Sequence, residues 1–339
     1  MTEEAMEEEG ALFSVRDAWW YNPRGNDPGV GAEKYAAKNP EFGATFTYNI
    51  NTEYESLAAA RKKAEKEAKK EGKSLSFPGY AALDAEANER NPMVWFTIKD
   101  ADGTVVRKLS KPLKKGLQRT TWDLSYASLW PVRPGAQRRG SRGGPLVAPG
   151  EYSVSMAKEV NGKITELAGP VSFTVKPLHT PTIAGAKPAE YVAYMKEVKA
   201  IRADMAAGEE MLDKLSEQVK AMETALAQAP VAPGKMNEAL YAFQDQVEVL
   251  ELQLEGSPSR GEVGEKAPPS VNTHFFAGYR GLSTTYGPTP NQRRSLGIAR
   301  EMIAEIMPKV KALMERLPSM QQQLRDAGAP YIIGAEGKQ

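Results

Sequence analysis

The chain of 339 residues contains no cysteine and only two histidines, His179 and His274. The absence of cysteine excludes disulfides, a thiolate nucleophile and every zinc site built on cysteine. A histidine-based triad or metal centre would have to use one of these two imidazoles. Neither has a second histidine near it in the sequence, so a packing or hydrogen-bonding role is favoured over catalysis or metal binding.

Excess charge and long apolar runs are also missing. Lys and Arg number 44 and Asp and Glu 43, which gives a formal net charge of +1. Nucleic-acid binders usually carry a clear basic excess, so no nucleic-acid partner is expected. No stretch approaches the roughly 18 apolar residues that a membrane-spanning helix needs. The sequence therefore predicts neither a nucleic-acid partner nor a membrane span.

The first ten residues hold five glutamates and no apolar segment, which is the opposite of a secretory signal peptide. They predict an acidic disordered tail over residues 1–10 and, read literally, a cytoplasmic chain. A lack of cysteine suits a reducing compartment and equally an exported bacterial protein without disulfides. Composition alone leaves the compartment open.

Residues 11–178 are rich in short β-prone runs that are separated by turn signals. Asp102-Gly103 and Asn161-Gly162 each lie between two such runs, and these dipeptides favour the tight turn of a β-hairpin. About seven short strands in series predict an immunoglobulin-like antiparallel β-sandwich. Residues 53–90 interrupt it with an Ala/Lys/Glu-rich helical insertion, whose basic residues we interpret as a solvated helix face.

After Pro188 the pattern becomes helical, with apolar residues at alternating steps of three and four. A Gly/Pro/Ser-rich linker over 256–288 divides the helices. The last helix has a continuous apolar seam, and Pro308 and Pro318 lie off that seam, where kinks or short breaks are expected. Residues 187–327 therefore predict an antiparallel three-helix bundle or coiled-coil hairpin, followed by a tail over 328–339.

Several segments together resemble a known family. They are Leu12–Trp19, Phe42–Tyr48, Ile98–Arg107, Gly116–Leu124, Val147–Tyr152, Gly287–Pro290 and Ala327–Pro330. On these segments, residues 11–334 resemble the C-terminal region of bacterial sortilin-like or BNR-repeat β-propeller proteins, which are described as glycosyl hydrolase-like. In that family an immunoglobulin-like domain and a long helical segment follow the propeller. The β-rich part also resembles the immunoglobulin-like domain of flagellar hook-capping proteins.

The propeller itself is missing from this chain, and so is the Asp-box of the BNR repeat. Asp100, Asp102 and Gly103 are similar to the Asp-box only superficially. They could form half of a calcium-binding loop, but the further ligands that such a loop needs are absent. A hairpin turn is therefore favoured for these residues. The hydrolase label therefore does not transfer. The resemblance implies a non-catalytic structural or binding module that docks onto a separately encoded or cleaved β-propeller, in an exported, periplasmic or extracellular assembly.

Two groups of residues are candidates for binding, and no cofactor or metal site is expected. Aromatic residues near the N-terminus are the docking candidates: Phe13, Trp19, Trp20 and Tyr21. A Gly/Pro-rich loop supplies arginines whose guanidinium groups suit acidic ligands: Arg133, Arg138, Arg139 and Arg142. The alternative function is thus a carbohydrate-active accessory unit, or a glycosyl hydrolase-like protein, that binds acidic glycans.

Overall fold

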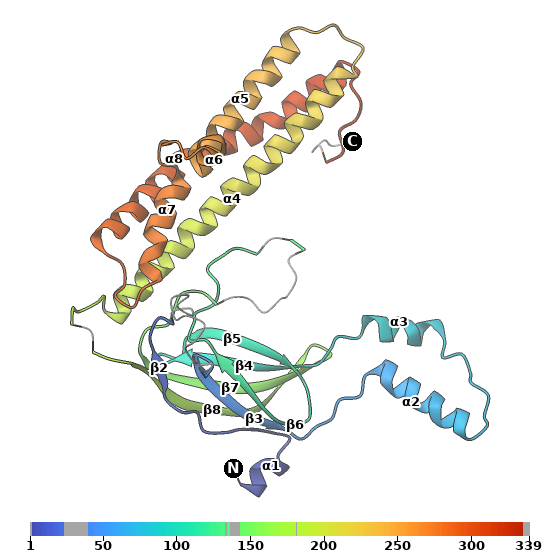
Figure 1. The fold of residues 1–339 in the computed structure, drawn as a ribbon. Coiled ribbons are helices and arrows are strands. Elements are labelled where there is room, and N and C mark those ends of the chain that lie inside the picture. Colours follow the sequence, from blue (N-terminus) through green and yellow to red (C-terminus); the bar gives the residue numbers. More distant parts are fainter. Residues whose placement is uncertain (1, 24–39, 133, 136–142, 181, 335–339) are drawn as a thin grey trace, which may run out of the picture. The chain divides into compact units, whose positions relative to one another are not determined.

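The computed structural model describes residues 2–23, 40–132, 134–135, 143–180 and 182–334. The chain divides into two compact units (Figure 1). The β unit comprises Met1–Ser128 and Ser141–Thr182, and the helical unit comprises Leu129–Gly140 and Ile183–Gln339. The helical unit is therefore discontinuous in sequence, because it takes a segment from within the β-rich part of the chain.

The β unit contains a three-stranded and a five-stranded sheet. The smaller sheet has the order β1-β3-β6, with β1 at Gly10–Leu12, β3 at Ala44–Ile50 and β6 at Gly116–Trp122. The larger has the order β2-β8-β7-β4-β5, with β2 at Ala18–Trp20, β8 at Lys163–Pro177, β7 at Gly150–Val160, β4 at Met93–Asp100 and β5 at Val105–Pro112. A short helix, α1 at Glu3–Glu7, precedes β1.

The prediction of an immunoglobulin-like antiparallel sandwich is wrong. The five-stranded sheet is mixed, because β2 runs parallel to β8, and it curls into a half-barrel (Figure 1). The pairing of β7 with β8 shifts register between Val154 and Met156 and again between Met156 and Ala157. Such irregularities bend a strand and increase its twist, which explains the curl.

Both predicted hairpins are confirmed. Asp100 and Thr104 close the β4–β5 turn, since the Asp100 N–H donates to the Thr104 carbonyl and the Thr104 N–H donates to Asp100 Oδ1 at 2.8 Å. Asn161 and Gly162 join β7 to β8, both with positive φ. The Asp100 carboxylate thus stabilises a turn, which is the role that the sequence favoured over calcium binding.

The core of the β unit is aromatic. Trp122 is completely buried, donates from Nε1 to the Ser125 carbonyl at 2.9 Å, and meets the ring of Tyr152 at 5.5 Å. Phe46 and Phe96 stack from the two sheets at 6.0 Å. Position 43 next to Trp122 requires glycine, because its φ is +128° and a Cβ there would lie 1.9 Å from the Trp122 carbonyl oxygen.

The insertion between β3 and β4 forms two helices, α2 at Leu57–Lys70 and α3 at Tyr80–Asn88, without any buried residue. An ion-pair network holds them together. Arg61 donates to Glu86 on α3 at 2.7 Å and to Glu65 on its own helix at 2.6 Å. Electrostatic contacts thus join the two helices where apolar packing is thin.

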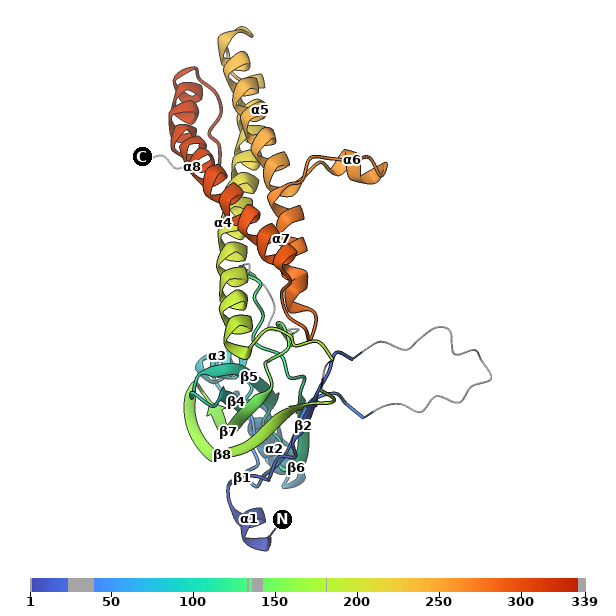
Figure 2. The ribbon, with the colours of Figure 1, turned by 90° about the vertical axis from the view of Figure 1, so that its left-hand side faces the viewer.

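The helical unit contains three long helices and shorter ones between them. These are α4 at Pro188–Ala227, α5 at Lys235–Glu255, α6 at Pro258–Glu262, α7 at Val271–Tyr279, the 3-10 turn η2 at Arg280–Leu282 and α8 at Pro290–Asp326. α5 packs along the C-terminal part of α4 and α7 along the N-terminal part, and α8 contacts α4, α5 and α7 (Figure 2). The prediction of a three-helix bundle is therefore wrong.

The difference lies in the predicted linker. Residues 256–288 contain α7, whose N-cap Ser270 accepts a hydrogen bond from the Thr273 N–H and whose Val271 and Phe275 are buried. The apolar seam of α8 is buried as expected from Leu296 to Leu317 and at Leu324, but between these the polar Gln321 is buried where the apolar Met320 was expected. No break occurs at Pro308 or Pro318, since α8 continues through both.

Candidate functional site

The four arginines of the candidate glycan site lie outside the described residues. Arg133, Arg138, Arg139 and Arg142 fall in the stretches 133 and 136–142. The candidate glycan site therefore stays a prediction made from the sequence.

The aromatic docking candidates divide between the two sheets of the β unit. Phe13 follows β1, is half-buried, and donates its N–H to the Thr47 carbonyl at 3.0 Å in the small sheet. Trp19 and Trp20 belong to β2 in the large sheet, and Tyr21 follows them with its ring edge against Phe42 at 4.9 Å. The structure therefore brings three of the four candidates to one sheet edge and leaves Phe13 elsewhere.

Strand alternation turns the two tryptophans in opposite directions. Ala18 is buried and Trp20 donates from Nε1 to the Val147 carbonyl at 2.6 Å, so these residues face the β unit. Trp19 between them points the other way, as the period of two requires, and is 56% exposed. One tryptophan anchors the strand, and its neighbour presents an indole to solvent.

Strand β2 is an edge strand that is held firmly. Within the described residues it pairs with β8 and with no other strand. Asp17, directly before it, accepts a hydrogen bond from the Thr174 N–H at 3.1 Å and forms an ion pair with Lys176. Hydrogen bonds from Lys176 and Thr174 lower the pKa of the Asp17 carboxyl, so it is ionised at neutral pH. These contacts fix the position of Trp19, and no described strand pairs with the outer edge of β2.

An aromatic cluster in the helical unit includes Trp130 from the discontinuous segment. Its ring lies 5.8 Å from Tyr279, 5.9 Å from Phe276 and 6.2 Å from Phe275, all on α7. The Arg202 guanidinium lies 4.8 Å from the centroid of Trp130 and forms two hydrogen bonds to Glu209, at 2.6 and 3.0 Å. The cluster thus ties the Trp130 segment to α4 and α7.

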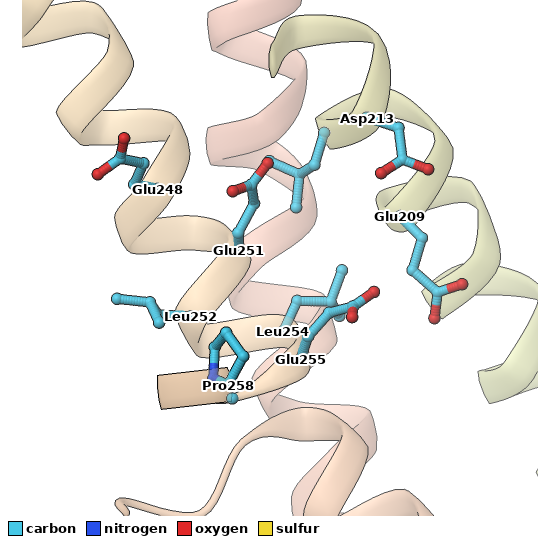
Figure 3. A pocket seen from close by; sticks show the side chains of 10 residues that line it. Glu209, Asp213, Glu248, Glu251, Leu252, Leu254, Glu255 and Pro258 are labelled. Carbon is cyan, nitrogen blue, oxygen red and sulfur yellow. The ribbon is translucent and has the colours of Figure 1, made fainter. Parts of the chain in front are cut away.

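A cavity of about 410 Å³ opens next to this cluster, between α4 and α5 (Figure 3). Five carboxylates line it: Glu209 and Asp213 from α4, and Glu248, Glu251 and Glu255 from α5. Burial raises the pKa of Glu255, and the negative charges of Glu209, Asp213 and Glu251 raise it further. The cavity therefore has a negative potential that would favour a cationic group.

Sequence reasoning missed this cavity, although part of the signal was present. Glu248, Glu251 and Glu255 are spaced by three and four residues, and so are expected on one helix face. Glu209 and Asp213 are spaced by four on α4. The alignment of α4 with α5 that brings the two rows together could not be read from either segment alone.

The histidines are far apart in the chain and differ in environment. His179 is exposed in the loop after β8, and His274 is half-buried on α7. Over the described ranges, no three His, Cys, Asp or Glu side chains are grouped in a way that could hold a metal ion. None of the helices in those ranges is both long and apolar enough to cross a membrane.

Comparisons of the chain with protein-family models, with curated proteins and with solved structures found no match.

Proposed function

We propose that this chain is a non-catalytic docking module that binds a protein partner through the edge of strand β2, with Trp19 as the central contact. The partner suggested by the sequence resemblance is a β-propeller of the sortilin-like type. The observation that carries the proposal is an indole 56% exposed on a strand whose neighbours fix it in place.

Trp19 is an aromatic contact that the fold holds in place before any partner binds. Tryptophan is over-represented among the few residues that dominate binding energy at protein interfaces. The ion pair of Asp17 with Lys176 and the hydrogen bond from Trp20 restrict β2 before binding, so little conformational entropy remains to be lost there. The outer edge of β2, which no strand of the described ranges pairs with, also suits a partner segment that adds backbone hydrogen bonds to the sheet.

A binding assay with the tagged full chain as bait tests this function. The chain is incubated with an extract of its source organism, and bound proteins are quantified by mass spectrometry. We expect a β-propeller protein at near-stoichiometric yield and a loss of at least about tenfold with Trp19→Ala, which corresponds to about 1.4 kcal/mol. Tyr80→Ala is the matched control, because Tyr80 is an aromatic residue of the same unit and 79% exposed. Identical proteins bound by wild type and Trp19→Ala would contradict the proposal.

A second candidate function, glycan binding, is favoured by the same exposed indole, because an aromatic ring can also stack on a sugar. A glycan array distinguishes the two functions. Binding of acidic glycans that is lost with Trp19→Ala, together with an empty protein pull-down, would establish the glycan function and refute protein docking.

A further inference from the structure

Helix α5 carries two apolar stripes, and the protein buries only one of them. The inward stripe consists of the buried side chains Leu240, Phe243, Val247, Leu250 and Leu254. At 3.6 residues per turn, Tyr241, Val249 and Leu252 fall on the opposite side of the helix. Their exposed fractions are 72%, 45% and 48%. We call these three residues the outward stripe.

The other long helices of the unit lack such a feature. Every residue of α4 and α8 is described, and neither helix has a large apolar side chain that is exposed. A surface helix normally has an apolar side toward the core and a polar side toward water. The outward stripe of α5 therefore departs from the pattern that its two neighbours follow. Val249 and Leu252 are one turn apart, whereas Asp245 and Glu248 separate them from Tyr241 along the helix. Neighbouring exposed apolar side chains such as Val249 and Leu252 are typical of an interaction site.

The surface is hollowed on the α8 side of the stripe. A groove of about 390 Å³ runs between α5 and α8, with Val249 and Leu250 on one wall and Ala312 and Leu313 on the other. Two cations of α8, Lys309 and Arg316, also line this groove. Arg316 donates to Gln246 at 2.9 Å and lies 5.2 Å from the Phe243 ring centroid. The groove continues the apolar surface that begins at the stripe.

Charge on the other side of the stripe indicates what kind of partner fits. On the α4 side, the outward stripe is bordered by the carboxylates of Glu248 and Glu255. Both also line the acidic cavity, to which α4 contributes Glu209 and Asp213 (Figure 3). A segment that lies on the stripe would place one flank against these groups. That flank has to be basic, because like charges in close contact are destabilising. A second copy that packed α5 antiparallel against α5 would instead bring the two rows of carboxylates together.

We propose that the outward stripe of α5 binds a basic amphipathic helix of a partner protein. The apolar side chains of that helix, repeating at three- and four-residue steps, pack on Val249 and Leu252 and into the α5–α8 groove. Its lysines or arginines face Glu248 and Glu255. The raised pKa of Glu255 agrees with this arrangement, since a cation would relieve the repulsion among the carboxylates.

Fluorescence anisotropy with a labelled synthetic peptide tests the proposal on the full chain. The probe is a Leu/Ala/Lys peptide of roughly 18 residues, with its leucines on one helix face and its lysines along one flank of that face. A scrambled peptide of the same composition, with its leucines distributed around the helix, is the control for charge alone. We expect the amphipathic peptide to bind at least about tenfold more tightly than the scrambled one.

Variants of the chain locate the binding surface. Val249→Ser with Leu252→Ser should weaken binding of the amphipathic peptide at least about tenfold, and Val231→Ser with Val263→Ser, two exposed valines outside the stripe, should leave it unchanged. Circular dichroism confirms that each variant is folded. Glu248→Gln with Glu255→Gln should weaken binding and reduce its salt dependence. Equal binding of both peptides, or binding unaffected by the stripe variant, would overturn the proposal. A wild-type dimer in sedimentation that the stripe variant dissociates would also overturn it, because a second copy would then occupy the face.

Discussion

Replacing Trp130 by alanine should destabilise the helical unit and leave the β unit unchanged. Trp130 contacts three rings of α7 at centroid distances of 5.8 to 6.2 Å, and Arg202 lies over its face at 4.8 Å. Aromatic pairs contribute about 0.5–1.5 kcal/mol each, and a partly exposed cation–π contact about 0.5–1 kcal/mol. Because the indole is 40% exposed and these contributions are not additive, we expect a loss of about 2–4 kcal/mol.

Two optical probes separate the units in one urea titration. Circular dichroism at 222 nm reports mainly on the long helices. The other four tryptophans, Trp19, Trp20, Trp95 and Trp122, all lie in the β unit, so fluorescence of a chain without Trp130 reports on that unit alone. Trp130→Phe is the matched variant, because it removes the same fluorophore but keeps an aromatic ring.

The expected result is a lower dichroism midpoint for Trp130→Ala than for Trp130→Phe, with equal fluorescence midpoints. The reasoning would be refuted if the free energies of unfolding from the two dichroism transitions agreed within about 0.5 kcal/mol, the ordinary range for surface substitutions. A parallel shift of both probes would also refute it, since the contribution of Trp130 would then not be confined to the helical unit.

Three further predictions concern stability. Gly43→Ala should destabilise the β unit by about 3 kcal/mol in fluorescence-monitored urea unfolding, because the new Cβ meets the Trp122 carbonyl at a φ that alanine rarely adopts. Leu215→Ala, at a fully buried position of α4, should cost about 2–5 kcal/mol in dichroism-monitored unfolding. A smaller loss would show that the helices move together and fill the space left by the leucine side chain. Glu255→Gln should raise the free energy of unfolding at pH 7. The pKa of Glu255 is raised in the folded state, so ionisation of this carboxyl destabilises the fold. The stability gained by Glu255→Gln should therefore vanish below about pH 4, where Glu255 is protonated in the folded and the unfolded chain. A gain that persists below that pH would refute this cause.

Local sequence signals predicted the parts of the fold that depend on neighbouring residues. The Asp-Gly and Asn-Gly turns identified both hairpins, because glycine tolerates the positive φ found at Gly103 and Gly162. The alternating steps of three and four from Leu296 to Leu317 identified the buried seam of α8. In each case the deciding interaction lies within a few residues along the chain.

Long-range pairing was not accessible in the same way. The three residues of β2 are β-prone, but nothing in them states that their partner is the end of β8 or that the pairing is parallel. Helix α7 was predicted as part of a linker, because glycines and prolines lie on both sides of it. Ser270 before Val271 is nevertheless a recognisable start signal for a helix. The aromatic residues at the N-terminus were found from composition, but their separation into an anchored Trp20 and an exposed Trp19 required the strand and its register.

The discontinuity of the helical unit affects the order in which the protein can be completed during synthesis. Trp130 leaves the ribosome before any residue of α4, whereas its ring partners on α7 come much later in the chain. The Trp130 indole therefore lacks these partners until most of the chain has been synthesised. For the same reason, a fragment that starts at Ile183 would lack Trp130, and a fragment that ends at Thr182 would carry it without Phe275 and Tyr279. Cutting the chain between the units at that point separates two parts of one aromatic cluster.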